Sequence, residues 1–380
     1  MKVAIIILML IASTAAAQNF AVIRNLENQN VGQCEYDSAS NTITFEPYVD
    51  SVNTCAVWFN FGVTGYRMDT VLTFKSKFKA TVHRPTYPAI SNDNTTFTLH
   101  KQNGKHSDLN LQIKPQNDTT YIATGHPYTY TRLNNFLNSH DNPSVMSSET
   151  IMTTKNGLDV KLLTITKSKR GKKKLIWIIC RQHAFESVGN YVMEGMLRYL
   201  LSDSCSKKLL KNHIFKIVPM VDVESVVNGQ SGRMSLPVDY NRDWENPKRT
   251  VIRLIEDEIK STAQKHDYKI FWDIHGTFPG GAPNGNFSYF DLNSTPSKHG
   301  NILDYWHKYA TISGYMPIPI SDNLNKYDGM TADWWNEINY GSSLLFSSTL
   351  EIDWAISPKK HEYTPADYIT IGKMMIQALE

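Results

Sequence analysis

The pattern of apolar and polar residues changes near residue 120. Before that point, short apolar runs such as residues 56–61 and 70–74 alternate with turns of Asn, Asp, Gly and Pro, and no long helical pattern occurs. Short strands separated by turn residues are typical of a β-sandwich. The first part of the chain is therefore predicted to be a small all-β sandwich domain.

After residue 120, apolar strand patterns alternate with helix patterns. Strands are predicted at residues 160–166, 175–180, 214–220, 269–274 and 344–352. Helices are predicted at residues 188–202, 247–265, 298–313 and 365–379. Such alternation predicts an α/β domain with a mixed, mainly parallel central sheet flanked by helices. Ligands in this architecture gather at the carboxyl ends of the strands.

The length and the first residues indicate two domains behind a leader. With 380 residues, the chain exceeds what one hydrophobic core usually organises. Residues 1–17 contain one lysine, an apolar stretch and a run of small residues, as a secretory signal peptide does. We expect domains at 18–120 and 121–380, and a protein that is secreted or held in the lumen of the secretory pathway. No other stretch approaches the ~20 apolar residues of a transmembrane helix, so no membrane span is expected.

Composition and charge narrow the class of partner. A net charge of +3 and 20% charged residues give no reason to expect a nucleic acid or an anionic membrane as a partner.

The four cysteines form two pairs that are local in sequence, Cys34 with Cys55 and Cys180 with Cys205. In an exported protein each pair could be a disulfide, and the first pair is the better candidate. Cys180, which ends an apolar run, could instead be a buried thiol.

Two predicted strands end in residues that bind metals. His183 and Glu186 follow the apolar run 175–180, and His275, with Gly276 after it, follows the run 270–274. Zn²⁺ in hydrolases takes three such protein ligands and leaves a fourth position for water. These three residues are therefore candidate ligands of one zinc ion.

Further polar residues surround this candidate site in the sequence. An irregular stretch after the strand at 214–220 contains Arg233, Asp239, Asn241 and Arg242. Two arginines near a zinc site suggest an anionic substrate, because a guanidinium can bind a carboxylate or stabilise an oxyanion. Glu351 lies inside an otherwise apolar strand, where a buried carboxylate is costly unless it has a task or a partner.

The order of these motifs resembles the zinc carboxypeptidase family of metallocarboxypeptidases. The order is His-x-x-Glu, an arginine, Asp-x-Asn-Arg, a histidine at a strand end and Thr-Leu-Glu near the C-terminus. Within the family, the chain resembles the cytosolic carboxypeptidase-like subfamily, which places a β-sandwich before the catalytic domain. The likeness covers nearly the whole mature chain and rests on residues 58–61, 127–132, 181–183, 218–220, 272–276 and 348–351.

The resemblance implies a role for each motif residue. His183, Glu186 and His275 would bind one Zn²⁺ per chain, and Asp239 would orient the imidazole of His183. The remaining roles concern the substrate: Asn241 and Arg242 would hold its C-terminal carboxylate, Arg233 would stabilise the oxyanion, Glu351 would act as general base, and Tyr327 would close over it. Tyr340 is a second candidate for the closing tyrosine.

The chain also departs from the family pattern. Most relatives have Pro-Gly between the first two ligands, whereas this chain has Ala184 and Phe185. Members that remove glutamate carry a basic residue near positions 328–334, and here the nearest cation is Lys326, so trimming of polyglutamate is not supported. Asp333 could favour a basic terminal residue or be a structural acid.

Three functions are compatible with these motifs. The first is an exported zinc carboxypeptidase that acts on the C-termini of peptides or proteins. The second is a non-catalytic module on the same fold that binds peptide C-termini or glycans. The third is a hydrolase of small N-acyl amino acids or cell-wall peptides. The complete set of ligands, together with Arg242 and Glu351, favours an enzyme over the binding module, and oligomeric state leaves no signal in the sequence.

Overall fold

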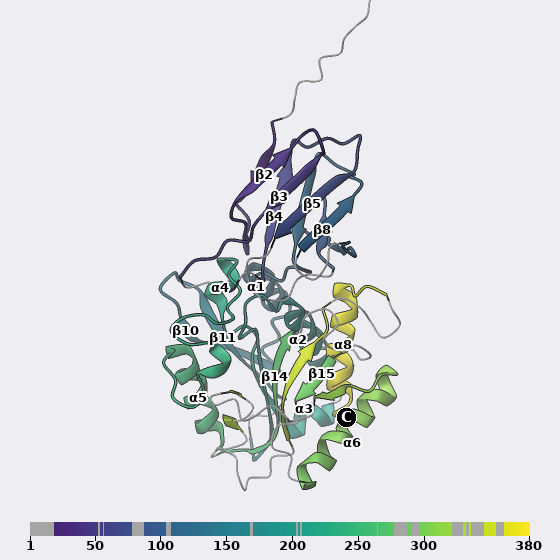
Figure 1. Ribbon diagram of the computed structural model, residues 1–380. Coiled ribbons are helices and arrows are strands. Elements are labelled where there is room, and N and C mark those ends of the chain that lie inside the picture. Colours follow the sequence, from purple (N-terminus) through teal and green to yellow (C-terminus); the bar gives the residue numbers. More distant parts are fainter. Residues whose placement is uncertain are drawn as a thin grey trace, which may run out of the picture.

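The structure is a computed structural model, and Figure 1 shows its course. The structure describes residues 19–51, 54–55, 57–77, 87–103, 108–167, 170–202, 204–205, 207–263, 265–276, 287–290, 296–320, 330–331, 334–335, 346–354 and 361–380. In Figure 1, two small sheets occupy one end of the molecule, and a larger sheet with its helices occupies the other. The predicted leader, residues 1–17, lies outside the described residues.

The N-terminal part consists of two β-sheets around one core. The five-stranded sheet has the order β1 (Ala21–Ile23), β4 (Asn60–Thr64), β9 (Thr119–Ala123), β6 (Ala89–Ser91) and β7 (Thr98–Leu99). The four-stranded sheet has the order β2 (Cys34–Asp37), β3 (Thr42–Phe45), β5 (Leu72–Lys77) and β8 (Asp108–Ile113). Alternate residues of both sheets, such as Ile43, Phe45 and Phe61, point into a shared core, as strands with one buried face require. The prediction of an all-β region before the α/β domain is confirmed; its boundary near residue 120 stays a prediction.

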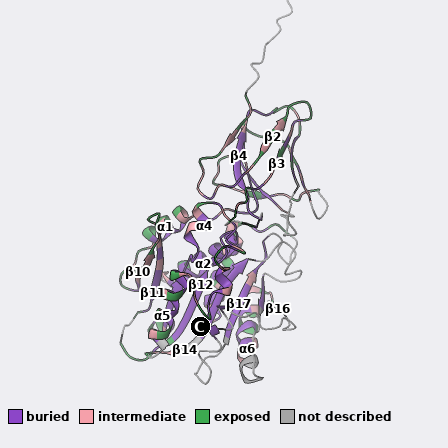
Figure 2. Cartoon of the chain, turned by 60° about the vertical axis from the view of Figure 1, so that its left-hand side comes forward, coloured by how far each residue is buried: buried purple, intermediate pink, exposed green. Residues whose placement is uncertain are grey.

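The larger sheet has eight strands and is mixed. Its order is β10 (Met146–Thr153), β11 (Asp159–Ile165), β13 (His213–Val218), β12 (Lys174–Cys180), β14 (Asp267–Gly276), β17 (Phe346–Ile352), β15 (Phe287–Phe290) and β16 (Ile318–Ile320). The central strands β13, β12, β14 and β17 run parallel to one another. Strand β11 pairs antiparallel with both β13 and β10, and β15 pairs antiparallel with β17. Figure 2 shows β12, β14 and β17 largely buried, and β12 is apolar from Leu175 to Cys180, as a strand with two covered faces requires.

Helices cover this sheet. They are α1 (Tyr130–Ser139), α2 (Ser187–Leu200), α3 (Lys207–Asn212), α4 (Val223–Val227), α5 (Thr250–Ala263), α6 (Pro296–Ser313) and α8 (Pro365–Gln377), with a 3-10 turn at Tyr240–Arg242. Helix α2 contacts β14, α6 contacts β17, and α8 packs against α2. Two glycines allow that packing: a Cβ at Gly195 would lie 1.9 Å from the Ile369 carbonyl oxygen, and one at Gly372 would lie 1.9 Å from the Val192 carbonyl oxygen. The α/β prediction is confirmed. Among the described residues, no helix has both the length and the apolar content needed to cross a bilayer.

Neither of the two possible disulfides is present in the structure, where all four cysteines are free thiols. Cys34 lies on β2 and packs against the core of the two small sheets, whereas Cys55 is buried in the core of the α/β part. The two thiols therefore belong to different cores. Cys180 ends β12 and is a buried thiol, the alternative that the sequence left open; burial raises its pKa far above the usual value.

Candidate metal centre and active site

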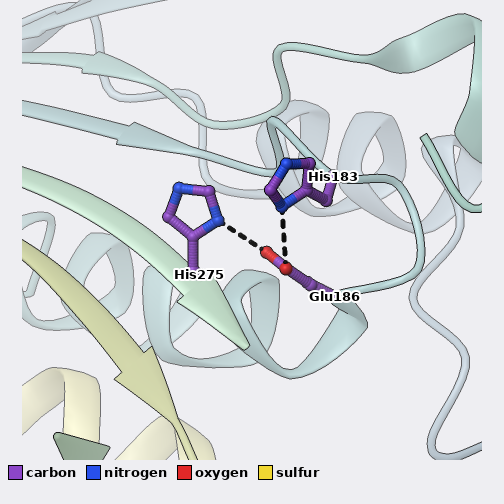
Figure 3. A group of neighbouring side chains, drawn as sticks. All are labelled: His183, Glu186 and His275. Carbon is purple, nitrogen blue, oxygen red and sulfur yellow. Dashed lines mark hydrogen bonds and ion pairs between the residues drawn. The ribbon is translucent and has the colours of Figure 1, made fainter. Parts of the chain in front are cut away.

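Three side chains from two neighbouring strands meet at the carboxyl edge of the large sheet. The turn that follows β12 carries His183 and Glu186, and β14 ends with His275 and Gly276. The strands β12 and β14 are parallel neighbours, so their ends lie side by side. His183, Glu186 and His275 are buried, and one ligand atom from each lies within 4.8 Å of the others. Figure 3 shows both imidazole rings directed at the Glu186 carboxylate.

The donor atoms form the kind of set that zinc binds. The His183 Nδ1 atom lies 2.9 Å from Glu186 Oε1, and the His275 Nδ1 atom lies 2.8 Å from Glu186 Oε2. On the far side of each ring, His183 Nε2 lies 2.9 Å from Asp239 Oδ1, and His275 Nε2 lies 3.0 Å from Asp273 Oδ2. A carboxylate at Nε2 holds a proton there and leaves the Nδ1 lone pair for a metal. Two imidazoles, one carboxylate and supported outer nitrogens therefore fit a zinc ion.

The charges of this cluster explain its proton affinities. Burial alone would lower the pKa of His183, but Glu186 and Asp239 outweigh burial and raise it to about 9. The pKa of His275 is likewise raised well above its usual value, since the charges of Asp273 and Glu186 overcome desolvation. Burial would raise the pKa of Glu186, yet the two imidazoles lower it to about 2. The histidines of the cluster thus bind protons at the Nδ1 atoms that face Glu186, where a metal cation would otherwise bind.

Asp239 is fixed by the turn that it begins. Its Oδ1 atom accepts a hydrogen bond from the Asn241 backbone N–H at 2.9 Å, and its Oδ2 atom accepts one from the Met234 N–H at 3.0 Å. These bonds aim the carboxylate at His183, whose Nε2 atom lies 2.9 Å from Asp239 Oδ1. The two backbone donors come from different parts of the loop, so the loop as a whole sets the direction of the imidazole.

The next two residues of the turn, Asn241 and Arg242, differ in their surroundings. Asn241 is buried, its Oδ1 atom accepts from Thr331 N at 3.1 Å and Oγ1 at 2.9 Å, and its Nδ2 atom lies 3.2 Å from His275 Nε2. Arg242 is half-buried, and its Nη1 atom donates to the Asn241 carbonyl oxygen at 2.6 Å. Asn241 therefore contacts the second histidine, whereas the guanidinium of Arg242 lies nearer the surface.

Glu351 lies beside the metal ligands on the neighbouring strand. It pairs in register with His275 across β14 and β17. Desolvation raises its pKa to about 7, and the nearby His275, Glu186, His183 and Arg233 shift it in smaller steps of both signs. Arg233, half-buried on the loop after α4, lies near enough for its charge to lower the pKa of Glu351. A carboxyl group with a pKa near neutrality can both accept and return a proton.

Some expected residues lie outside the described part of the chain. Tyr327 and Tyr340, the two candidates for the closing tyrosine, are among them, and so are Lys326 and Asp333. Their assignments stay predictions.

Two contributors to the site escaped the sequence reasoning. Asp273 precedes His275 by two positions, and this spacing places both side chains on one face of β14. The spacing is a usable signal. Arg181 is completely buried; its Nε atom donates to the Ala184 carbonyl oxygen at 2.7 Å and its Nη1 atom to Asn190 Oδ1 at 2.7 Å. A lone arginine after an apolar run gives no comparable signal, because its acceptors lie on the ligand turn and on α2.

The unusual Ala184 and Phe185 fit the ligand turn without disturbing it. The Phe185 ring stacks on His183 with 6.2 Å between centroids and contacts Trp354 at 5.6 Å. The Phe185 N–H donates to the Ser231 carbonyl oxygen at 3.0 Å. The side chain that replaces glycine is thus packed in the core behind the ligands.

These features define a class of protein: an α/β domain with a mixed eight-stranded sheet and a candidate mononuclear metal site of two histidines and one glutamate. Residues 133–281 match the family of zinc carboxypeptidases. This part of the chain is therefore a zinc carboxypeptidase domain, as the motifs predicted.

Relatives and solved structures agree with this placement. The chain is 26% identical over 276 residues to cytosolic carboxypeptidase 3 of Bos taurus, an alignment that covers 65% of this chain and 28% of the bovine protein. The chain thus spans less than a third of that relative. The fold is similar to a metallo-carboxypeptidase from Burkholderia cenocepacia, with a TM-score of 0.82, 19% identity and coverage of 95% and 98% of the two chains. It is also similar to a metallo-carboxypeptidase from Pseudomonas aeruginosa in complex with (2-guanidinoethylmercapto)succinic acid, with a TM-score of 0.76, 18% identity and coverage of 94% and 98%.

Proposed function

We propose that the protein is a zinc carboxypeptidase that hydrolyses the C-terminal peptide bond of peptides or proteins. The observation that carries the proposal is the convergence of His183, Glu186 and His275, with Glu351 paired in register beside His275. Three protein ligands and an adjacent base are the components of metal-assisted hydrolysis. A module that only binds peptides has no use for such a base.

Each residue of the site has a separate role in the proposed hydrolysis. Zinc held by the three ligands would supply Lewis acidity, which makes water a nucleophile at neutral pH and polarises a carbonyl group. Glu351 accepts the proton of the attacking water on its carboxylate and passes it to the nitrogen of the leaving amine. Its pKa of about 7 suits both transfers. Asp239 and Asp273 hold the outer nitrogens of the two histidines and so keep the rings directed inward.

The arginines account for the choice of the last peptide bond. Arg242 binds the C-terminal carboxylate, since its planar guanidinium can contact both oxygens. Asn241 shares in this step by holding Arg242, whose Nη1 atom donates to the Asn241 carbonyl oxygen at 2.6 Å. Arg233 stabilises the oxyanion as charge develops. The succinic acid derivative in the Pseudomonas aeruginosa structure is consistent with a site for carboxylates.

We also propose that the protein is exported. The support is the composition of residues 1–17, with one lysine, an apolar stretch and a run of small residues. The test is expression of the full chain in a secretory host, followed by N-terminal sequencing of protein from the medium. A mature N-terminus near Gln18 supports export, and full-length protein retained inside the cell contradicts it.

One experiment tests the catalytic proposal. The purified protein is incubated with a library of peptides that end in basic, acidic, aromatic and aliphatic residues, and mass spectrometry follows the ends. We expect loss of single C-terminal residues, abolished by a zinc chelator and restored by added zinc. Glu351→Gln serves as the control because it keeps the shape of the base and removes its proton transfer. Cleavage that resists the chelator, or equal cleavage by Glu351→Gln, contradicts the mechanism.

The same library separates the neighbouring functions. Release of residues from N-acyl amino acids, with none from longer peptides, would favour the hydrolase of small substrates. Peptide binding without cleavage by the zinc-loaded protein would favour the binding module.

A further inference from the structure

The loop that carries Arg233 contains one residue, Met234, in a backbone conformation that its side chain does not favour. Gly229, Gly232 and Met234 all have positive φ angles, at 66°, 72° and 55°. Such angles are easy for glycine, but for methionine they cost energy and persist only where the surroundings impose them. The backbone around Arg233 must therefore be held by contacts from outside the loop.

One set of contacts comes from the metal-ligand turn. The Phe185 N–H donates to the Ser231 carbonyl oxygen at 3.0 Å. Gly232 lies so close to the same turn that a Cβ would be 2.6 Å from the Ala184 nitrogen. This side of the loop thus touches the segment between His183 and Glu186.

The second set comes from the N-terminal β-region. The Asn30 Nδ2 atom donates to the Gly229 carbonyl oxygen at 2.9 Å in a buried contact, and the Asn28 N–H donates to the Val227 carbonyl oxygen at 3.0 Å. A Cβ at Gly229 would lie 2.1 Å from the Gln29 carbonyl oxygen, so the two backbones touch. The Thr54 hydroxyl also lies 3.4 Å from the Met234 carbonyl oxygen, one residue from Arg233.

Asn30 is itself held firmly. Its backbone exchanges two hydrogen bonds with Asn60, the first residue of β4, at 3.0 and 3.1 Å. Its Oδ1 atom accepts from the Tyr48 N–H at 2.6 Å, and its Nδ2 atom also reaches the Tyr48 carbonyl oxygen at 3.1 Å. A side chain that is 4% exposed and anchored to a sheet on one side can transmit a fixed position to the loop on the other.

We infer that the N-terminal β-region is part of the catalytic machinery, with Asn30 as the positioning residue that sets Arg233 through the loop 228–236. This inference rests on the proposed function, in which Arg233 stabilises the developing oxyanion. An interaction made mainly in the transition state acts on kcat. Release of the clamp therefore reduces kcat and leaves substrate binding by Arg242 largely intact.

The test compares Asn30→Ala with Asn41→Ala in the full-length zinc-loaded protein. Asn41 is the control, because it is an asparagine buried in the β-region to a similar extent, 1% exposed against 4% for Asn30. Its Nδ2 atom donates to the Arg67 and Val71 carbonyl oxygens at 2.9 and 3.1 Å, within the β-region itself. Both variants lose buried hydrogen bonds, but only one of them releases the loop.

The first readout is hydrogen exchange of residues 228–236, which requires no substrate. We expect Asn30→Ala to accelerate exchange there by about tenfold relative to Asn41→Ala, the effect of roughly one lost buried hydrogen bond. Equal exchange in the two variants overturns the inference. If Asn30→Ala does not fold, Gly229→Ala disrupts the contact between Asn30 and Gly229 from the side of the loop.

The second readout is kinetic. We expect Asn30→Ala to lower kcat about tenfold or more while KM stays within about twofold, as for a misplaced transition-state contact. In an Arg233→Ala background the same change should have a clearly smaller effect, because the positioned group is gone and only the contact of Met234 with Asp239 remains. An undiminished loss in that background overturns the inference. A wild-type protein without zinc-dependent cleavage contradicts the proposed function instead, and hydrogen exchange then still decides whether the clamp exists.

Discussion

Zinc binding should release protons from the histidines of the site at neutral pH. In the metal-free site, His183 lies between Glu186 and Asp239, and His275 lies between Glu186 and Asp273, with all four contacts at 2.8 to 3.0 Å. These charges raise the pKa of His183 to about 9 and that of His275 well above its usual value, against the effect of burial. His183 therefore carries two protons at pH 7, and the protonated form of His275 is favoured in the same way. A metal at Nδ1 requires a neutral ring, so a protonated histidine must lose one proton.

The size of the effect follows from these pKa values. At pH 8, one unit below the pKa of His183, about ten molecules in eleven still hold the extra proton. His183 should thus release close to one proton per zinc ion from about pH 6 to 8, and His275, whose pKa is raised in the same direction, adds to this release. The apparent affinity should rise at least about tenfold for each pH unit in that range, since protons compete with the metal.

The assay is calorimetric titration of zinc into the metal-free protein, in two buffers with different ionisation enthalpies. The Glu351→Gln variant is the better starting protein, because Glu351 has a pKa of about 7 and would add its own titration. Asp239→Asn is the matched control: it removes one charge beside His183, so at pH 8 fewer protons should be released. Release of fewer than one proton per ion at pH 7, or an affinity that does not change between pH 6 and 8, would refute the reasoning.

Three further predictions concern catalysis and stability. Glu351→Gln should reduce kcat by about 10²- to 10⁴-fold, the usual share of general acid-base catalysis, with zinc content unchanged by elemental analysis. Arg181→Met should lower the free energy of unfolding by roughly 2–4 kcal/mol in urea and weaken zinc binding, because it leaves the Ala184 carbonyl oxygen and other buried acceptors without a donor; wild-type stability would contradict this. Gly195→Ala should destabilise the fold by about 1–3 kcal/mol despite better helix propensity, since its Cβ would lie 1.9 Å from the Ile369 carbonyl oxygen. An unchanged melting temperature would show that α2 and α8 can separate at little cost.

The central strands and long helices could be predicted from local pattern. The predicted strand at 175–180 corresponds to β12 (Lys174–Cys180), and the predicted helix at 188–202 corresponds to α2 (Ser187–Leu200). Both are long and apolar enough for periodicity to identify them. The edge strand β10 (Met146–Thr153) was not predicted, because its residues are mostly polar and partly exposed. Only its pairing with β11 makes it a strand.

The candidate ligands were predictable for a similar reason. His183, Glu186 and His275 each follow an apolar run, and parallel strands bring such positions to one edge of a sheet. The contacts around those ligands were harder to predict from the sequence. The acceptors of Arg181 lie on the ligand turn and on α2, and the contacts of Asn241 reach to Thr331.

The sequence by itself determined which groups can take part in the chemistry and the order in which they occur. Donor atoms, charges and strand-forming runs are local properties, and each can be recognised from a few neighbouring residues. Only the tertiary structure decided that one carboxylate faces both Nδ1 atoms and that Asn30 reaches Gly229, 199 positions further along the chain. Such contacts depend on how two separate sheets pack, and no local pattern of residues encodes a distance between segments so far apart.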